Sequence, residues 1–514
     1  MRPRQAAMQL RRRLGGPARQ PKRALSTGLE DIQMASMPAA PSSEGVVAQG
    51  GAVSLLRQAP YDALGDGWRE TRDPLWTYTL HYHGWLAQLS ADDAEATALS
   101  WIAEHRRGVG WEPYPTSMRL LHWLGWLQSA GGTRLAGPRE RMLDSMAAQL
   151  EHLAAHVEEH IDGNHLWTNL AALTACGLGL RGPLAHDLLE RFGPRFERIV
   201  QEQLYGDGVH RERTPTYHCL LAEQLAIVVD LARGKAPTLV ESLEPTLRSM
   251  VAATGAFTHP DGDVALFGDS QRGAPVTPSN LAARTGQRLA QGNALAPEGG
   301  FARRRWDDWC VLWTFGGVGM PWQTGHAHAD ALALELSLGD ERIIVDAGVG
   351  TYEVGRLRSY ARATAAHNTA TVGFGEPDQH EVWASHRVGR RARPALIQAT
   401  DTELAGRVCG VFSPGTHTRT IERDAGDVVV RDDVAPFGPA TVRWFVPHSA
   451  TVVVAGGCAD VVTVAGTKLR LETNAGALSR TRVDGWHAIG RRARRWCLAT
   501  QIPRDGLVTR FVRG

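Results

Sequence analysis

Hydrophobic positions spaced three or four residues apart dominate the first half of the chain. In the clearest stretch Met142, Met146, Leu150, Leu153 and Val157 share one face of a helix. Similar amphipathic segments cover about 93–106, 117–129, 164–180, 185–204, 217–233 and 239–254. Helices joined by short connections pack antiparallel, so the pattern predicts an array or toroid of helical hairpins. No fixed sequence period is evident, which argues against a solenoid.

Beyond about residue 308 the pattern changes to short runs of β-branched and aromatic residues separated by turns, such as DVVVRDDV, TVRWFV and KLRLE. Many strands of this kind predict an antiparallel sandwich. Between Thr324 and Asp346, alternating leucines, a Gly-Asp turn and the run Ile343–Val345 predict a β-hairpin. The fold class is therefore predicted to be α+β and multidomain, with helices first and strands second.

The length of 514 residues implies more than one core. We predict a disordered basic N-terminal arm over 1–55 and a helical domain over 56–270. A Pro-, Gly-, Ala- and Arg-rich connecting segment over 271–308, with one helix near 279–290, would lead to the strand domain over 309–514.

Composition excludes some function classes. The formal net charge is +2, from 56 basic and 54 acidic residues, so nothing favours nucleic acid as a partner, and an anionic ligand needs a local basic cluster. No apolar run approaches the roughly 20 residues of a membrane span, and no secretory signal peptide is visible. Six cysteines without a CxxC pair argue against a zinc ribbon or a disulfide framework, and the redox compartment stays open.

A histidine-rich segment begins the predicted hairpin. Side chains two apart on an extended segment share a face, so His326 and His328 are expected on one side, with Asp346 returning beside them. His328, Asp346 and His367 would supply two imidazoles and a carboxylate, which suits Zn²⁺ with water as the fourth ligand and leaves His326 for chemistry. The alternative is that these histidines are hydrogen-bonded edge residues.

Two motifs of the helical half carry further candidates. In DGNHLWTNL, Asp162 or Asn164 could cap the helix that follows, and His165 comes next. In DGVHRERTPTYHCLLAEQ, Pro215 starts a helix and puts Tyr217 in its first turn.

A basic cluster precedes that tyrosine, and aromatic residues crowd the start of the helical half. The cluster, which could hold an anionic group such as a carboxylate or a sulfate, consists of His210, Arg211 and Arg213. Most of the aromatic residues are expected in the core, and the alternative is that some line a sugar-binding groove: they are Trp76, Tyr78, Tyr82, Trp85, Trp101, Trp111, Tyr114, Trp123 and Trp126.

Three ordered motifs resemble the heparinase II/III-like polysaccharide lyases: GHAHADAL at 325–332, IIVDAG at 343–348 and TAAHNT at 364–369. LWTYTLHYHGWL at 75–86 and WEPYPTSMRLLHWLGWL at 111–127 resemble the N-terminal toroid of that family. The resemblance covers roughly residues 75–450 and implies an α/α toroid, an incomplete helical barrel, followed by a β-sandwich. It also implies an acidic polysaccharide as partner and a location in the cell envelope or periplasm, while a cytoplasmic location stays open.

The resemblance assigns roles to residues of this sequence. Asn164, His165, Tyr217 and His326 are the implied catalytic residues, and the implied zinc, held by His328, Asp346 and His367, is a structural element beside the active site. The implied substrate-binding residues are Tyr78, Arg119, His122, His210, Arg211, Arg213 and His218.

The chemistry expected of this set is β-elimination from a uronate. The C5 proton is α to a carboxylate, whose growing negative charge must be neutralised, a task for which Asn164 and His165 are suitable donors. Tyr217 can act as base or acid if cations such as Arg211 or Arg213 lower its pKa, and His326 is the second proton-transfer candidate.

Other functions stay open at this point. Zinc could instead hold a reactive hydroxide in a metallohydrolase. A glycoside hydrolase would need facing carboxylates, for which Glu212 and Asp330 are available. A non-catalytic glycan-binding protein is the third alternative. The sequence departs from relatives at Ala347–Tyr352 and at Thr168-Asn169, so the choice among heparan sulfate, chondroitin, hyaluronan, alginate and bacterial exopolysaccharides is not fixed.

Overall fold

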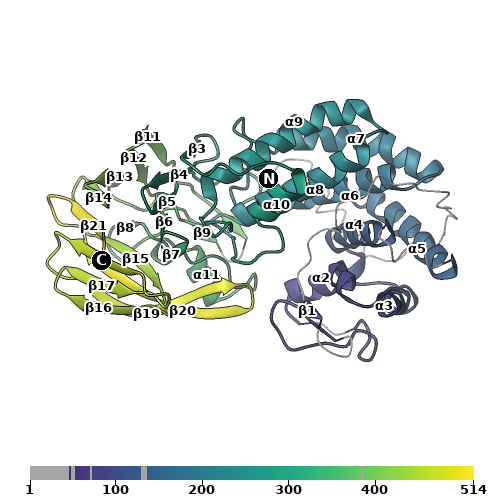
Figure 1. Cartoon of the computed structure of the whole chain (residues 1–514), viewed down its shortest axis with the longest axis horizontal. Coiled ribbons are helices and arrows are strands. Elements are labelled where there is room, and N and C mark those ends of the chain that lie inside the picture. The colour runs from purple at the N-terminus through teal and green to yellow at the C-terminus, as the bar shows by residue number, and fades with distance from the viewer. Residues whose placement is uncertain (1–45, 48–51, 70–71, 129–135, 384–385) are drawn as a thin grey trace. The chain divides into compact units, whose positions relative to one another are not determined.

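The computed structural model describes residues 46–47, 52–69, 72–128, 136–383 and 386–514. The predicted disordered arm lies outside the described residues except for 46–47 and 52–55. The chain divides into two compact units, coloured along the chain in Figure 1. The first contains the residues up to Gln203 and Leu220–Arg248, and the second contains Leu204–Cys219 and Ser249–Gly514. The segment 204–219 therefore belongs with the strands, although it precedes the predicted domain boundary at residue 270.

The first unit is helical, as the hydrophobic spacing predicts. Its helices begin at proline or a capping residue in several places; the Asp73 side chain, for example, accepts a hydrogen bond from the Trp76 N–H at the start of the first of them. They are α2 (Pro74–Tyr82), α3 (Ala91–Glu104), α4 (Pro113–Gln128), α5 (Ala136–Ala155), α6 (Gly163–Gly179), α7 (Pro183–Glu202), and the greater parts of α8 (Pro215–Ala232) and α9 (Pro237–Ala253). Every helix predicted in this half is present.

Tryptophan fills the core of the helical unit. The fully buried rings, for which the core interpretation is confirmed, are Trp76, Trp85, Trp101, Trp111 and Trp123. Each such ring buries roughly 150–250 Å², which contributes about 4–6 kcal/mol before conformational entropy is subtracted. Tyr78 and Tyr82 are the residues of the predicted aromatic set that stay half-exposed.

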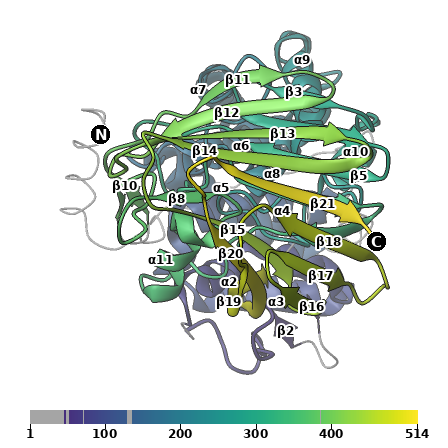
Figure 2. The ribbon, with the colours of Figure 1, turned by 90° about the vertical axis from the view of Figure 1, so that its left-hand side faces the viewer.

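The second unit is built from antiparallel sheets, as predicted. Figure 2 shows the largest, of eight strands, which runs from β11 to β16. In spatial order it contains β11 (Ala395–Ala399), β12 (Glu403–Cys409), β13 (Thr416–Asp424), β14 (Asp427–Ala435), β21 (Leu507–Arg513), β18 (Lys468–Thr473), β17 (Cys458–Val462) and β16 (Thr451–Ala455).

Two smaller sheets pack with it around one apolar core. The five-stranded sheet contains β3 (Ala294–Ala296), β4 (Phe301–Trp306), β5 (Trp309–Thr314), β6 (Leu334–Leu338) and β7 (Glu341–Ile344). The four-stranded sheet contains β19 (Ser479–Ala488), β20 (Arg491–Gln501), β15 (Ala440–Pro447) and β8 (Ala370–Val372). A helical unit followed by an antiparallel sandwich confirms the predicted fold class.

Close contacts fix the layers of the sandwich. Trp444 of β15 meets Phe511 of β21 edge-on, with ring centroids 5.1 Å apart. A Cβ atom at Gly406 of β12 would stand 2.9 Å from the Trp313 ring of β5, so this crossing needs a residue without a side chain. The connecting segment predicted over 271–308 contains α10 (Pro278–Thr285), as expected, but also β3 and β4, so the sheet begins before residue 309.

The predicted hairpin exists as β6 and β7, but the residues before it are different from expectation. His326 and His328 lie in a segment without strand structure. The alternation of side chains along a strand therefore does not determine the directions of these two side chains. On β6 the polar residues Glu335 and Ser337 are also buried, because both bind His259: the Glu335 carboxylate lies 2.7 Å from Nε2 and the Ser337 hydroxyl 2.8 Å from Nδ1. The strand is therefore buried on both faces.

Candidate active site

A tyrosine and a histidine stack face to face in the second unit. Tyr217 stands in the first turn of α8, which begins at Pro215 as predicted. Its ring lies on the His326 imidazole with centroids 3.9 Å apart and planes 12° apart. The Tyr217 hydroxyl is 2.9 Å from the hydroxyl of Tyr352. The two residues predicted to transfer protons are thus in contact.

Glu212 holds the imidazole of His326. The ring Nδ1 lies 2.5 Å from Glu212 Oε2, and the carboxylate is almost fully buried while the imidazole is 12% exposed. A carboxylate accepts from Nδ1–H, which leaves Nε2 as the nitrogen for proton transfer. The sequence offers Glu212 only as a hydrolase carboxylate, whereas in the structure it pairs with His326. The other hydrolase candidate, Asp330, accepts from the Gly268 N–H, and burial raises its pKa to about 6.

Three predicted substrate-binding residues hold the loop before Tyr217 instead. His218 Nδ1 accepts from the His210 N–H at 3.2 Å, His210 Nδ1 accepts from the Glu212 N–H at 3.3 Å, and Arg213 donates to the Gly317 carbonyl at 3.0 Å. Both histidines are 1% exposed, and burial lowers the pKa of each to about 4. These histidines are enclosed and serve as backbone acceptors, and their predicted contact with substrate stays a prediction.

Arg358 is the cation beside the tyrosines. Its guanidinium lies 5.1 Å from the centre of the Tyr352 ring, and its charge interacts with both Tyr352 and Tyr217. Arg211 and Arg213, expected in this place, lie instead over the ring of Tyr205 at 4.7 and 4.9 Å. Arg358 was not predicted, because α11 (Arg356–Arg362), which carries it, is far from Tyr217 in sequence.

Asp269 connects Arg358 to the histidine segment. Both oxygens of its buried carboxylate accept from the Arg358 guanidinium, one of them at 2.7 Å, and Oδ1 also lies 2.8 Å from His328 Nε2. Burial alone would raise the pKa of Asp269, but Arg358 and His328 hold it well below its usual range. Asp269 and Arg358 were not predicted, and no motif marks either one.

The three predicted metal ligands are close together and incompletely bonded. His367 Nδ1 lies 2.6 Å from Asp346 Oδ1, and the rings of His367 and His328 have centroids 5.3 Å apart. The remaining atoms His328 Nδ1, Asp346 Oδ2 and His367 Nε2 are buried without a hydrogen-bond partner. Within the described ranges, no group of three His, Cys, Asp or Glu side chains has the arrangement of a ready-made metal site.

In the helical unit Asp162, not Asn164, is the cap of α6; its side chain accepts from the Gly163 N–H. Asn164 occupies the first turn of α6 and is 2% exposed. His165 is 25% exposed, with Nδ1 3.1 Å from Glu158 Oε2 and its ring 4.5 Å from that of Tyr114. The tautomer of His165 is therefore fixed by a carboxylate, like that of His326.

The groove positions predicted on α4 are mostly interior. Arg119 is fully buried, donates to Gln149 Oε1 at 2.9 Å and lies 3.8 Å from the Trp101 ring centre. His122 is 4% exposed, and burial lowers its pKa to about 4. Both were predicted to bind substrate, and both are parts of the core. Tyr78 remains half-exposed, with its hydroxyl bound to the Glu112 carboxylate.

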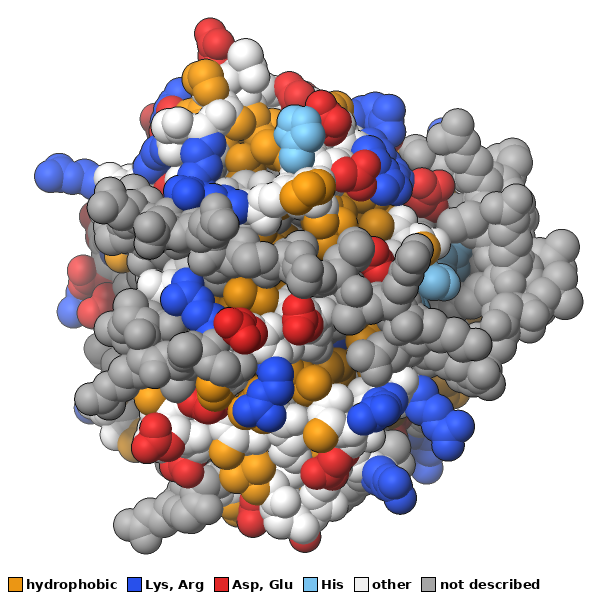
Figure 3. Space-filling model, turned by 90° about the vertical axis from the view of Figure 1, so that its right-hand side faces the viewer, with side chains coloured by type: hydrophobic (Ala, Val, Ile, Leu, Met, Phe, Trp, Pro, Cys, Tyr) orange, Lys and Arg blue, Asp and Glu red, His pale blue; other side chains and the backbone are white. Residues whose placement is uncertain are grey.

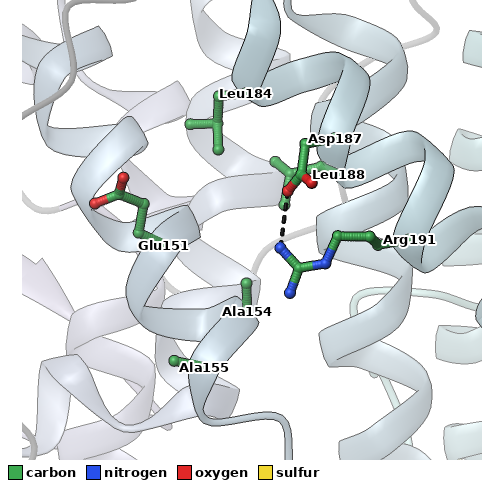
Figure 4. Close-up of a pocket in the computed structure, with 7 residues that line it drawn as sticks. All are labelled: Glu151, Ala154, Ala155, Leu184, Asp187, Leu188 and Arg191. Atoms are coloured by element: carbon green, nitrogen blue, oxygen red, sulfur yellow. Dashed lines mark hydrogen bonds and ion pairs between the residues drawn. The ribbon is translucent and has the colours of Figure 1, made fainter.

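The surface of the helical unit offers a hollow away from these residues. Figure 4 shows the side chains of α5 and α7 that line this hollow of about 460 Å³, where Asp187 and Arg191, both on α7, form an ion pair of 2.8 Å. It contains none of the predicted site residues. In Figure 3 basic and acidic side chains are interspersed over the described part of one face, consistent with the small net charge. None of the described helices combines the length and apolar composition needed to cross a bilayer.

Family models match nearly the whole chain. The heparinase II/III N-terminus matches residues 52–285, and the heparinase II/III-like C-terminal domain matches residues 289–501. The chain belongs to the heparinase II/III-like family. Family membership confirms the predicted resemblance and, at the level of the family, the enzyme class of a carbon–oxygen lyase acting on polysaccharides.

Solved structures agree on the fold. A heparinase III structure is similar with a TM-score of 0.69 and 16% identity, covering 88% of this chain and 80% of that one. A heparan sulfate lyase from Pedobacter heparinus is similar with a TM-score of 0.59 and 16% identity, covering 89% and 80%. No curated protein matches the chain. At this identity the likeness concerns the heparinase II/III-like fold alone.

Proposed function

We propose that this heparinase II/III-like chain cleaves an acidic, uronate-containing polysaccharide by β-elimination and leaves a 4,5-unsaturated uronate. The observation that carries the proposal is the stack of Tyr217 on His326, with Glu212 behind the imidazole and Tyr352 at the tyrosine hydroxyl. Two proton-transfer groups in contact, one of them with its tautomer fixed, suit a reaction that removes one proton and returns another. Simple binding of a glycan needs no such pair.

The elimination needs a base, an acid and a means of neutralising charge. The base removes the C5 proton, the electron pair of that bond forms the C4–C5 double bond, and the C4–oxygen bond breaks as the acid protonates the leaving oxygen. No water is consumed. Tyr217 and His326 are the residues proposed for the two proton transfers, and Arg358, whose charge interacts with Tyr217 and Tyr352, is the cation beside them. Asn164 and His165 are proposed as donors to the uronate carboxylate.

Zinc is proposed as a structural element held by His328, Asp346 and His367. The support is the set of three buried atoms without partners, one on each residue, since burying such atoms unpaired costs roughly 1–3 kcal/mol each. His328 presents its other nitrogen to Asp269 at 2.8 Å, the carboxylate partner typical of a ligating histidine. When bound, the metal would supply a fixed crosslink below the segment that carries His326.

Metal content and thermal unfolding test the zinc proposal. The purified chain should contain about one zinc per molecule, and His367→Gln should lose it together with several degrees of melting temperature. The matched control is His448→Gln, an exposed histidine of the same unit, which should keep both. A metal-free protein with unchanged melting temperature and unchanged activity would contradict the proposal.

Ultraviolet absorbance with a panel of uronate polysaccharides tests the activity. Wild-type protein should generate the chromophore of the unsaturated uronate on at least one of them. Tyr217→Phe and His326→Ala should each reduce kcat by about 10²–10⁴-fold, whereas Tyr205→Phe, a neighbouring tyrosine outside the stack, should not. New reducing ends without the chromophore would replace elimination by hydrolysis. No cleavage of any uronate glycan would leave the glycan-binding alternative.

A further inference from the structure

A small hairpin beside the catalytic stack presents a cation and a flat ring together. β9 (Val382–Trp383) and β10 (Arg387–Val388) pair antiparallel, with Arg387 directly opposite Trp383. Directly opposite residues of an antiparallel pair point to the same face. Arg387 is exposed, and Trp383 is 50% exposed. Such exposure is unusual for a tryptophan in a protein whose other indoles are mostly buried.

The hairpin is tied to the segment that carries His326. Buried Arg362 donates to the carbonyls of Trp383 at 3.3 Å, Arg387 at 3.4 Å and Ala327 at 3.0 Å. The Thr324 hydroxyl accepts from the Val388 N–H at 3.1 Å. One guanidinium therefore joins the backbone of both strands to the chain next to His326, and the hairpin is a continuation of the candidate active site.

His386 makes the second connection. Its ring stacks near Tyr352, with centroids 6.3 Å apart and planes 18° apart. Tyr352 is the residue whose hydroxyl meets that of Tyr217. Contacts thus run from Tyr217 through Tyr352 to His386, the residue that precedes Arg387.

The charge of this region is strongly positive. The sequence HRVGRRARP over 386–394 contains four arginines. Arg390 is held by Glu381, whose carboxylate accepts from its N–H at 2.9 Å, and its guanidinium lies 4.5 Å from the Phe412 ring centre. Within the described part of the chain, no hydrogen bond or ion pair engages the guanidinium of Arg387 or of Arg393. These two arginines are therefore available to an anionic ligand.

The tryptophan is supported as a platform. A Cβ atom at Gly389 would stand 2.8 Å from the Trp383 ring, so the indole packs closely against the backbone at this glycine. The Glu381 carboxylate lies against the same glycine, with Oε2 2.6 Å from the position of that Cβ atom. A ring braced from one side and half-exposed on the other has a free face for a sugar ring.

We infer that Trp383 and Arg387 form a subsite for one acidic sugar of the polysaccharide, next to the sugar at the catalytic stack. The pyranose would lie on the Trp383 indole, and its carboxylate or sulfate would bind the Arg387 guanidinium, whose planar fork matches such groups. The inference rests on the proposed function and deepens it, because it names residues that select an anionic chain. The cluster at Arg211 and Arg213, predicted for this task, is occupied by protein carbonyls.

Steady-state kinetics on the cleaved glycan test the subsite. Arg387→Gln and Trp383→Ala should each raise KM by about tenfold and leave kcat within about twofold, since neither residue belongs to the stack. Arg387→Lys should recover part of the loss, because it keeps the charge without the fork. The salt dependence of KM should weaken in Arg387→Gln, as expected when an ionic contact is lost.

Matched controls separate this effect from charge or aromatic content in general. Arg407→Gln removes an exposed arginine from β12, and Phe374→Ala removes a ring that is 90% exposed elsewhere on the same unit. Both should keep the wild-type KM. If the two subsite variants matched their controls, the subsite would be excluded while the lyase activity of the wild type stood.

Binding to the catalytically impaired Tyr217→Phe chain provides the independent test. Calorimetry with uronate oligosaccharides should show about tenfold weaker Kd when Arg387→Gln or Trp383→Ala is added. A wild-type protein that cleaves no glycan, combined with this loss of binding, would overturn the lyase proposal and keep the subsite. Equal Kd in all variants, or no binding of any acidic glycan, would overturn the subsite.

Discussion

Buried histidines of the two units have different hydrogen-bond partners. In the helical unit His81 and His83 accept the indole N–H groups of Trp101 at 3.1 Å and Trp123 at 3.0 Å, so both are neutral acceptors. In the second unit five histidines lie against carboxylates, in the pairs His259–Glu335, His326–Glu212, His328–Asp269, His367–Asp346 and His417–Asp432. Both partners set the tautomer of the imidazole they bind, but only a carboxylate also stabilises the imidazolium that forms when the ring takes up a proton.

The exposed fraction of the imidazole distinguishes the histidines proposed for catalysis from those that only stabilise the fold. Among the carboxylate pairs of the second unit, His326 is 12% exposed and the other histidines are 0–1% exposed. In the helical unit the same pairing occurs at His165, which is 25% exposed, and in the surface pair His186–Glu190, whose imidazole is 74% exposed. Between the enclosed pairs and this surface pair lie His326 and His165, the two histidines predicted for catalysis. A catalytic histidine is recognised here by an imidazole that a carboxylate orients and that solvent can reach, and less by the number of histidines in its motif.

The largest expected effect comes from a fully buried pair. Asp432 accepts from His417 and from the buried Arg419, and Arg419 also donates to the carbonyls of Leu332 and Asn368. Asp432→Asn leaves a buried guanidinium without its counter-charge and should lower the free energy of unfolding by about 3–5 kcal/mol, measured by urea denaturation. Asp433→Asn, at the exposed neighbouring position, should change it by less than about 0.5 kcal/mol. Equal losses of unfolding free energy in the two variants would show that burial of the pair does not determine its contribution to stability.

Disruption of the partly exposed pair His326–Glu212 should reduce activity more than stability. Glu212→Gln keeps the shape but loses the charge that orients His326, and kcat should fall by about 10–100-fold. The free energy of unfolding should fall less than in Asp432→Asn, because the imidazole retains contact with solvent. Glu353→Gln, an exposed carboxylate next to Tyr352, is the control. A Glu212→Gln enzyme with wild-type kcat and reduced stability would reverse the assignment of the two kinds of pair.

The smallest effect concerns pH and the helical unit. Burial lowers the pKa of His122 to about 4, so the unfolded chain binds a proton below pH 6.5 that the folded chain does not. Stability is therefore fully present above pH 6.5 and is lost as pH falls towards 4, by about 1.4 kcal/mol at pH 5.5 for this residue. His122→Gln should reduce the decrease between pH 7 and 5.5 by about 1.2 kcal/mol, since about 0.2 kcal/mol is already lost at pH 7. His186→Gln, an exposed histidine of α7, should leave it unchanged.

Sequence periodicity was sufficient for the helices and most strands, because amphipathic spacing reports directly which face is buried. The same signal could not separate core from groove on α4, where Arg119 and His122 are enclosed along with nearly every other residue of the helix. A polar residue on a mostly apolar helix gives the same sequence pattern whether it lies in the core or lines a groove. The structure shows that Arg119 lies in the core, because Trp101 and Gln149 pack around it.

The histidine, tyrosine and aspartate positions of the site could be predicted because ordered motifs carry them. Their partners could not. Asp269 and Arg358 are separated by 89 residues, and neither stands in a motif or at a periodic position. Trp383 and Arg387 come together by pairing of two-residue strands, which are too short for any alternation to be visible.

The grouping of residues 204–219 with the strands limits how this protein can be taken apart. A fragment beginning at the predicted connecting segment, residue 271, would lack Glu212, Tyr217 and Asp269, although all three bind residues that the fragment keeps. Exchange of sandwich domains between relatives would separate the same partners. The part of the chain that makes these contacts is therefore discontinuous in sequence, and a chimera that keeps them needs residues 204–219 of this chain as well as its residues from Ser249 onward.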